Sequence, residues 1–79
     1  MKVYKALSIA GSDPSGGAGI QADLKTFSSL GVYGATVITA VVDENTVSVT
    51  DVHPVPVPFV QGQIRSVLDD VGADAIKIG

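Results

Sequence analysis

The sequence contains no cysteine and no tryptophan, a single histidine and few charges of either sign. Without cysteine the chain can form neither a disulfide framework nor a thiolate zinc site, and one histidine cannot make a histidine-rich metal site. A net charge of −3 argues against nucleic acid, which requires a basic surface. No apolar run reaches the ~20 residues of a membrane span, and the run after the basic N-terminus is too short for a signal peptide. We therefore expect a cytoplasmic protein without nucleic-acid or membrane partners.

The composition is nevertheless that of a folded chain. Apolar residues make up 46% of the 79 residues and charged residues only 16%, which is too apolar for an intrinsically disordered segment. A chain of this length forms one domain at most and has a thin core, because it buries only ~60% of its unfolded surface. The mean hydropathy of +0.40 predicts apolar surface that another part of a protein should cover.

Hydrophobic patterning predicts a β-α-β-α-β order, with strands at 6–10, 33–42 and 75–78 and helices over about 17–30 and 58–71. This order implies an α/β fold with a parallel sheet and right-handed crossovers. Nothing follows the third strand to flank or cover it. We therefore expect the chain to be a fragment of a larger α/β protein.

Glycine, proline and polar turn-forming residues predict where these helices and strands end. Gly31 and Gly72 stand where each helix should stop. Asp43 to Thr46 are polar turn formers that should end the second strand. Residues 47–52 alternate valine with polar residues and fit a short exposed strand or an extended loop. Residues 53–58 carry proline at every second position, which predicts an extended connector.

The loop from Gly11 to Gly19 contains four glycines and a proline between the first strand and the first helix. Glycine lets the backbone approach a ligand, and the first N–H groups of a helix are free donors, so the loop favours an anion or a polar small molecule. It is no Walker A loop, because no Gly-Lys-Ser/Thr follows. Residues 17–22 match the dinucleotide pattern G-x-G-x-x-A, with acidic residues some 20-odd positions on, but six residues separate this motif from the strand. A plain connecting loop is the alternative.

Two acidic positions are candidate site residues. Asp23 projects toward the apolar side of its helix, where a carboxylate is costly unless it is paired or used; the alternative is that it only complements the helix dipole. Glu44 follows the second strand and should share a crevice with the glycine loop, because ligands of open α/β sheets bind at the carboxyl ends of strands. For Asp43 we prefer a solvated turn, and for Lys77 a lysine at the sheet edge.

Six blocks of the sequence carry a family resemblance: 6–13, 15–26, 31–34, 37–40, 52–56 and 74–79. They are similar to the N-terminal part of the hydroxymethylpyrimidine/phosphomethylpyrimidine kinases of thiamine biosynthesis, which belong to the ribokinase-like superfamily. The resemblance implies that residues 1–79 are an N-terminal fragment of one ribokinase-like kinase domain, with a truncated three-layer fold and a mostly parallel sheet. It also implies transfer of the γ-phosphoryl group of ATP, with Mg²⁺, to 4-amino-5-hydroxymethyl-2-methylpyrimidine and then to its monophosphate.

The resemblance also implies a pyrimidine site made of Gly11, Ala18, Asp23, Val42 and Glu44. Gly11 and Ala18 would leave room for a flat ring, Asp23 would bind polar groups, and residue 44 would read the edge of the ring. The family usually has glutamine at position 44, which both donates and accepts, whereas ionised glutamate only accepts. A pyridoxal-type alcohol is therefore an alternative substrate, and we expect Glu44→Gln to tighten aminopyrimidine binding.

The family's nucleotide site, anion hole and catalytic base lie beyond residue 79, so the resemblance implies no catalytic, nucleotide-binding or metal-binding residue in this chain. The isolated chain should be inactive. Family members commonly form homodimers. Two other hypotheses remain open: a small non-catalytic binding or assembly module with the ancestral fold, and a dinucleotide-binding domain.

Overall fold

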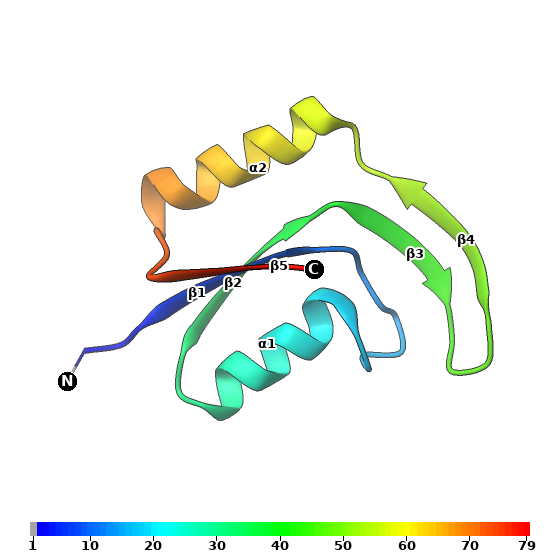
Figure 1. Cartoon of the computed structure of the whole chain (residues 1–79), viewed down its shortest axis with the longest axis horizontal. Coiled ribbons are helices and arrows are strands. Elements are labelled where there is room, and N and C mark those ends of the chain that lie inside the picture. The colour runs from blue at the N-terminus through cyan, green and yellow to red at the C-terminus, as the bar shows by residue number, and fades with distance from the viewer. Residues whose placement is uncertain (1) are drawn as a thin grey trace.

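A computed structural model describes residues 2–79 as a parallel sheet between two helices (Figure 1). The sheet has the order β2-β1-β5, built from β1 (Lys5–Ala10), β2 (Tyr33–Ile38) and β5 (Ala75–Ile78). Helix α1 (Gly19–Ser29) covers one face and α2 (Val57–Asp70) covers the other. This arrangement confirms the predicted α/β class, the parallel sheet and the positions of both helices to within two residues. No helix of residues 2–79 has the length and apolar character to cross a membrane.

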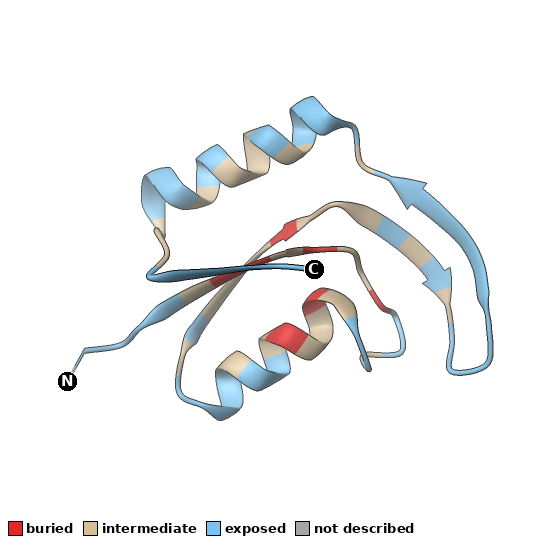
Figure 2. Ribbon diagram, viewed as in Figure 1, coloured by how far each residue is buried: buried red, intermediate tan, exposed pale blue. Residues whose placement is uncertain are grey.

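The core lies around the central strand β1, where Leu7 and Ser8 are both fully buried. Neighbouring residues of a strand point to opposite faces, so burial of both shows that each face of β1 is covered. Val37 of β2 and Ile20 of α1 complete the buried apolar set together with Ala10. Figure 2 shows that the buried residues are confined to the sheet, α1 and the loop before it, while α2 and β5 have none.

The predicted strand 33–42 is wrong in one respect, because the structure divides it at Thr39 into β2 and β3 (Ala40–Glu44). Thr39 donates its N–H to the carbonyl of Ala10 at 3.0 Å and accepts from the N–H of Val55 at 2.9 Å. Beyond this point the chain leaves the parallel sheet and pairs antiparallel with β4 (Val49–Pro54). The element order is therefore β-α-β-β-β-α-β. The extra hairpin extends away from the main sheet (Figure 1).

The predicted turn at 43–46 is also displaced. Asp43 and Glu44 belong to β3, and the reversal occupies the following residues. Asn45 Oδ1 accepts the N–H groups of Val47 and Ser48 at 2.9 and 3.1 Å, which confirms that this side chain holds the turn. Strand β4 then runs through the first two residues of the predicted connector, and pairs only with β3. Such an edge position tolerates a proline, which has no N–H to donate.

Candidate functional site

The glycine loop and β3 lie side by side at the carboxyl end of β1. Ser12 donates its N–H to the carbonyl of Ala40 at 2.9 Å, and its hydroxyl accepts the N–H of Val42 at 3.0 Å. Ala40 also flanks the side of Gly11 where a side chain would stand, since a Cβ built on Gly11 would lie 3.6 Å from the Ala40 carbonyl oxygen. The glycine loop thus lies against β3, with Gly11 beside Ala40 and Ser12 bonded to Val42.

Asp13 organises the loop from within. Its carboxylate accepts the N–H and the hydroxyl of Ser15 at 2.9 and 2.6 Å and the N–H of Gly17 at 3.0 Å, while its own N–H donates to Gln21. The Ser15 hydroxyl is the main cause that holds the pKa of Asp13 below its ordinary value, against the opposing effect of burial. Sequence reasoning missed this residue. The short spacing Asp-x-Ser, typical of an Asx turn, was the available signal.

These bonds change the expected ligand of the loop. Several of its backbone donors already face a carboxylate of the chain itself, so the loop does not fit the phosphates of a nucleotide as a glycine-rich cradle would. Within residues 2–79 no group of three or more histidine or acidic side chains could hold a metal ion either. The self-bonded loop suits a polar organic molecule better than a phosphate.

The glycines of the loop divide into two kinds. Gly16 and Gly19 have φ of 81° and 60°, a conformation that favours glycine, so the fold itself requires them. Gly11 has no positive φ, and an added Cβ would meet only ordinary contacts with Ala40. The fold itself therefore does not require glycine at position 11, where a Cβ would lie in contact with Ala40.

Asp23 is buried, with 9% of its surface exposed, and both of its oxygens have partners. Oδ2 accepts from the fully buried Ser8 hydroxyl at 2.6 Å, and Oδ1 accepts from Lys77 Nζ at 2.8 Å. The bond from Lys77 is the largest cause that lowers the pKa of Asp23, followed by the bond from Ser8. Of the two interpretations of Asp23, the structure supports the buried, paired carboxylate. Lys77 lies on β5 at the edge of the described sheet, as predicted, but its bond to Asp23 was not predicted.

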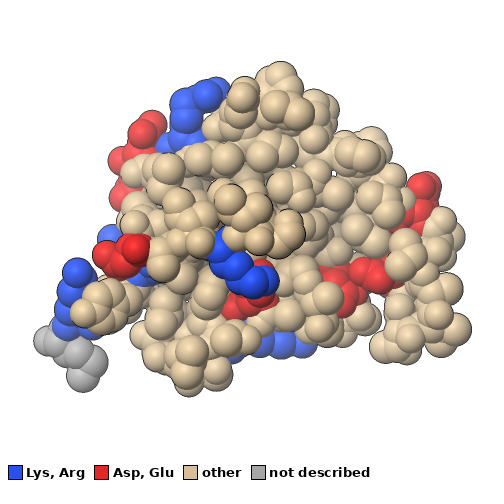
Figure 3. Space-filling model, viewed as in Figure 1, with Lys and Arg blue, Asp and Glu red and all other residues tan. Residues whose placement is uncertain are grey.

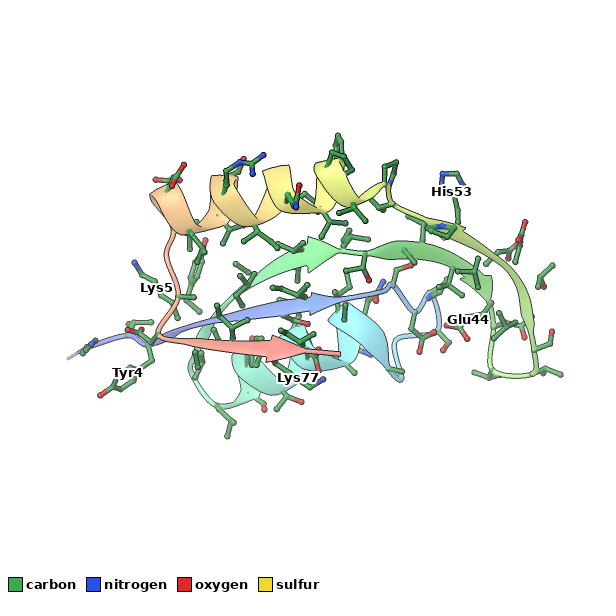
Figure 4. All side chains as sticks on the ribbon, turned by 45° about the horizontal axis from the view of Figure 1, so that its top comes forward. Tyr4, Lys5, Glu44, His53 and Lys77 are labelled. Carbon is green, nitrogen blue, oxygen red and sulfur yellow. The ribbon has the colours of Figure 1, made fainter. Side chains whose placement is uncertain are left out.

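Glu44 lies on the hairpin beside the glycine loop (Figure 4). Its half-buried side chain has a raised pKa, first because of burial and then because Asp13 is close enough to repel its charge and to share a hydrogen bond. Asp43, the next residue along β3, is exposed. Glu44 and Asp23 have separate partners, so the structure links Glu44 to the loop and Asp23 to the sheet. Ala18 is exposed just before α1.

A groove of about 440 Å³ lies elsewhere, between β2 and α2, with Thr36, Phe59 and Gln63 among its lining residues. It contains no charged side chain and none of the predicted site residues. On the face shown in Figure 3, acidic side chains extend toward the hairpin, whereas the groove offers only uncharged chemistry. The loop and β3 therefore remain the better candidate for recognising a polar molecule.

Comparison with known proteins agrees with this geometry. The family described as phosphomethylpyrimidine kinase matches residues 13–79. A hydroxymethylpyrimidine/phosphomethylpyrimidine kinase of Escherichia coli is 60% identical over the whole chain, which covers 30% of that relative. A phosphomethylpyrimidine kinase structure from Clostridium difficile matches 96% of the chain and 33% of its own length, with a TM-score of 0.92 and 51% identity. A Staphylococcus aureus pyridoxal kinase in complex with AMP-PCP and pyridoxal matches 99% of the chain and 29% of its own, with a TM-score of 0.86 and 46% identity.

The chain thus spans about a third of the length of the relatives it matches. Its sheet, its hairpin and its glycine loop all lie within the region matched by the Escherichia coli relative, and the family is one of kinases. The chain belongs to the phosphomethylpyrimidine kinase family.

Proposed function

We propose that this chain forms the acceptor-binding part of a hydroxymethylpyrimidine/phosphomethylpyrimidine kinase. The complete enzyme would phosphorylate 4-amino-5-hydroxymethyl-2-methylpyrimidine and then its monophosphate, with ATP and Mg²⁺ bound mainly by residues beyond Gly79. A cytoplasmic location suits such a biosynthetic role. The observation that supports the proposal is the hydrogen bonding of Ser12 to Ala40 and Val42, by which the glycine loop lies against β3, the strand that also carries Glu44.

The proposed site combines a surface with little side-chain bulk and two acidic residues, Asp23 with a lowered pKa and Glu44 with a raised pKa. Gly11, Ala18 and Val42 present little side-chain bulk, which suits the face of an aromatic ring. The ionised Asp23 accepts hydrogen bonds from a hydroxyl or an amine. Burial, with a smaller effect of Asp13, raises the pKa of Glu44, and its carboxylate accepts a hydrogen bond from an exocyclic amine. This property supports an aminopyrimidine as the substrate.

The test is a coupled ADP-release assay on the protein expressed from its complete reading frame. We expect turnover that depends on the hydroxymethylpyrimidine, and none from the isolated 79 residues, since the proposal assigns the nucleotide site mainly to residues beyond Gly79. Pyrimidine-dependent ADP release by the isolated chain would contradict the assignment of these residues to the acceptor side. A complete frame that ends at Gly79 would instead favour a non-catalytic binding module.

A pyridoxal-type alcohol is the second candidate substrate. It is favoured by Glu44, which departs from the family's glutamine, and by the 46% identity to the pyridoxal kinase. Measuring kcat/KM for both alcohols on the same preparation separates the two proposals. A value at least about tenfold higher for pyridoxal would overturn the pyrimidine assignment, since that ratio corresponds to about 1.4 kcal/mol of transition-state preference.

A further inference from the structure

We propose that Lys77 is a positioning residue that fixes the orientation and the charge of the Asp23 carboxylate for the acceptor substrate. This inference rests on the proposed function, because it presumes that Asp23 contacts that substrate. Lys77 is not among the residues that the family resemblance assigns to the site.

The sheet register brings the three side chains together. Ser8 of β1 and Lys77 of β5 are paired residues of neighbouring parallel strands, so their side chains point to the same face of the sheet. That face is covered by α1, which supplies Asp23. One carboxylate therefore joins β1 and α1 to β5, which lies 54 residues beyond Asp23 in the sequence, and Figure 4 shows Lys77 on the side of β5 that faces α1.

The burial of the three groups assigns different tasks to them. Ser8 is fully buried and Asp23 nearly so, whereas the Lys77 side chain is 57% exposed. A buried carboxylate stays ionised only when a positive charge or hydrogen bonds compensate for lost hydration. The Ser8 hydroxyl supplies a hydrogen bond but no charge, whereas Lys77 supplies both a hydrogen bond and the positive charge, and its bond is the largest cause of the lowered pKa of Asp23.

The other charged groups nearby are engaged elsewhere. Lys25, the cation of α1, donates to the carbonyl of Gly16 at 2.9 Å, and Asp13 of the loop binds Ser15 and Gly17. The causes that shift the pKa of Asp23 include no charged group except Lys77. Without Lys77, Asp23 should take up a proton at higher pH and lose its ability to act purely as an acceptor.

The test compares Lys77→Met, Lys77→Arg and the control Lys2→Met in the protein expressed from its complete reading frame. Lys2 forms an exposed 3.8 Å ion pair with Asp74 and is remote from the site, so its loss removes a lysine without touching Asp23. For each protein we compare kcat/KM at pH 8 with kcat/KM at pH 5.5. We expect this ratio to be about tenfold larger in Lys77→Met than in the parent, because the acid side of the pH profile moves to higher pH. Lys77→Arg should largely restore the parent profile and Lys2→Met should keep it.

Two further measurements separate this inference from a structural role and from failure of the proposed function. The ¹³C carboxyl signal of Asp23, followed by NMR without substrate, should titrate at higher pH in Lys77→Met than in the parent and in Lys2→Met. In an Asp23→Asn background, Lys77→Met should no longer alter the pH profile. An unchanged Asp23 titration would overturn the inference even in an active kinase. A shifted titration in a protein that phosphorylates no pyrimidine would support the charge coupling and refute the proposed function alone.

Discussion

The backbone of Gly19 passes directly over the carbonyl of Gly11, which accepts the N–H of Ile20 at 3.0 Å. A side chain at position 19 would collide with that carbonyl and would lie 3.2 Å from the N–H nitrogen of Asp13. The φ of 60° at Gly19 is itself unfavourable for any residue with a Cβ. The start of α1 is therefore fastened to the end of β1 at a point where only glycine fits.

Gly19→Ala should lower the free energy of unfolding by about 3 kcal/mol, since it combines strain at a positive φ with a backbone clash. Denaturant unfolding of the complete protein measures this loss. Gly62→Ala is the matched control, because its Cβ would meet nothing within 4 Å in the middle of α2. That control should gain about 0.5–1 kcal/mol from improved helix propensity. Equal effects of the two substitutions would contradict the assigned role of Gly19.

Gly11→Ala separates ligand binding from folding. We expect its free energy of unfolding to change by less than about 0.5 kcal/mol, because the fold accommodates a Cβ there. Substrate affinity, measured by calorimetry, should fall about tenfold as the added methyl group occupies space proposed for the ring. Large destabilisation with unchanged affinity would show that Gly11 serves the fold instead.

Local signals in the sequence were enough to predict the elements whose ends they mark. Gly31 and Gly72 end the two helices with φ of 71° and 74°, as their positions predict. The break at Thr39 could not be predicted, because the run from 33 to 42 is apolar and β-branched throughout and nothing local distinguishes two strands from one. The break arises from tertiary contacts to Ala10 and Val55.

The site shows the same division between local and distant information. The burial of Asp23 follows from helical periodicity, and the approach of Glu44 to the glycine loop follows from the rule for strand ends. The partner of Asp23 depends on β5 lying next to β1 with Ser8 opposite Lys77, a register that these residues do not encode locally. Whether Asp43 or Glu44 faces the loop likewise depends on the β3-β4 hairpin, which the sequence pattern did not predict.

Asp13→Asn should weaken the loop at neutral pH. The lowered pKa of Asp13 means that its ionised form stabilises the folded state above the ordinary value of 3.8, and that this contribution is lost as the pH falls through the lowered folded value. The difference in unfolding midpoint between parent and variant should therefore be largest near pH 7 and shrink in acid. Asp69→Asn, an exposed change on α2, is the matched control and should leave the unfolding midpoint at pH 7 close to that of the parent.

Gln63 fastens α2 to the end of β2. Its side-chain amide donates to the carbonyl of Ile38 and accepts the N–H of the same residue, both at 2.9 Å. Gln63→Ala leaves two half-buried backbone groups without these partners and should cost about 2 kcal/mol of unfolding free energy. Gln61→Ala, an exposed change two residues earlier on the same helix, should cost less than about 0.5 kcal/mol. Similar losses of unfolding free energy in the two variants would contradict the role of Gln63 in holding α2 to β2.

Glu44→Gln removes an acid that Asp13 repels. Because the folded state holds the Glu44 proton more tightly than the unfolded chain does, the parent loses stability as the pH rises from 4.5 through the raised folded pKa. The variant should therefore be the more stable protein at neutral pH, and its advantage should vanish below that interval.

Glu44→Gln should also bind the aminopyrimidine more tightly at neutral pH, since an amide always donates and accepts. Parent affinity should approach that of the variant in acid, where Glu44 is protonated. Calorimetry at both pH values that shows equal or weaker binding by the variant would reject this role for Glu44, while Asp43→Asn on the same strand should leave affinity unchanged.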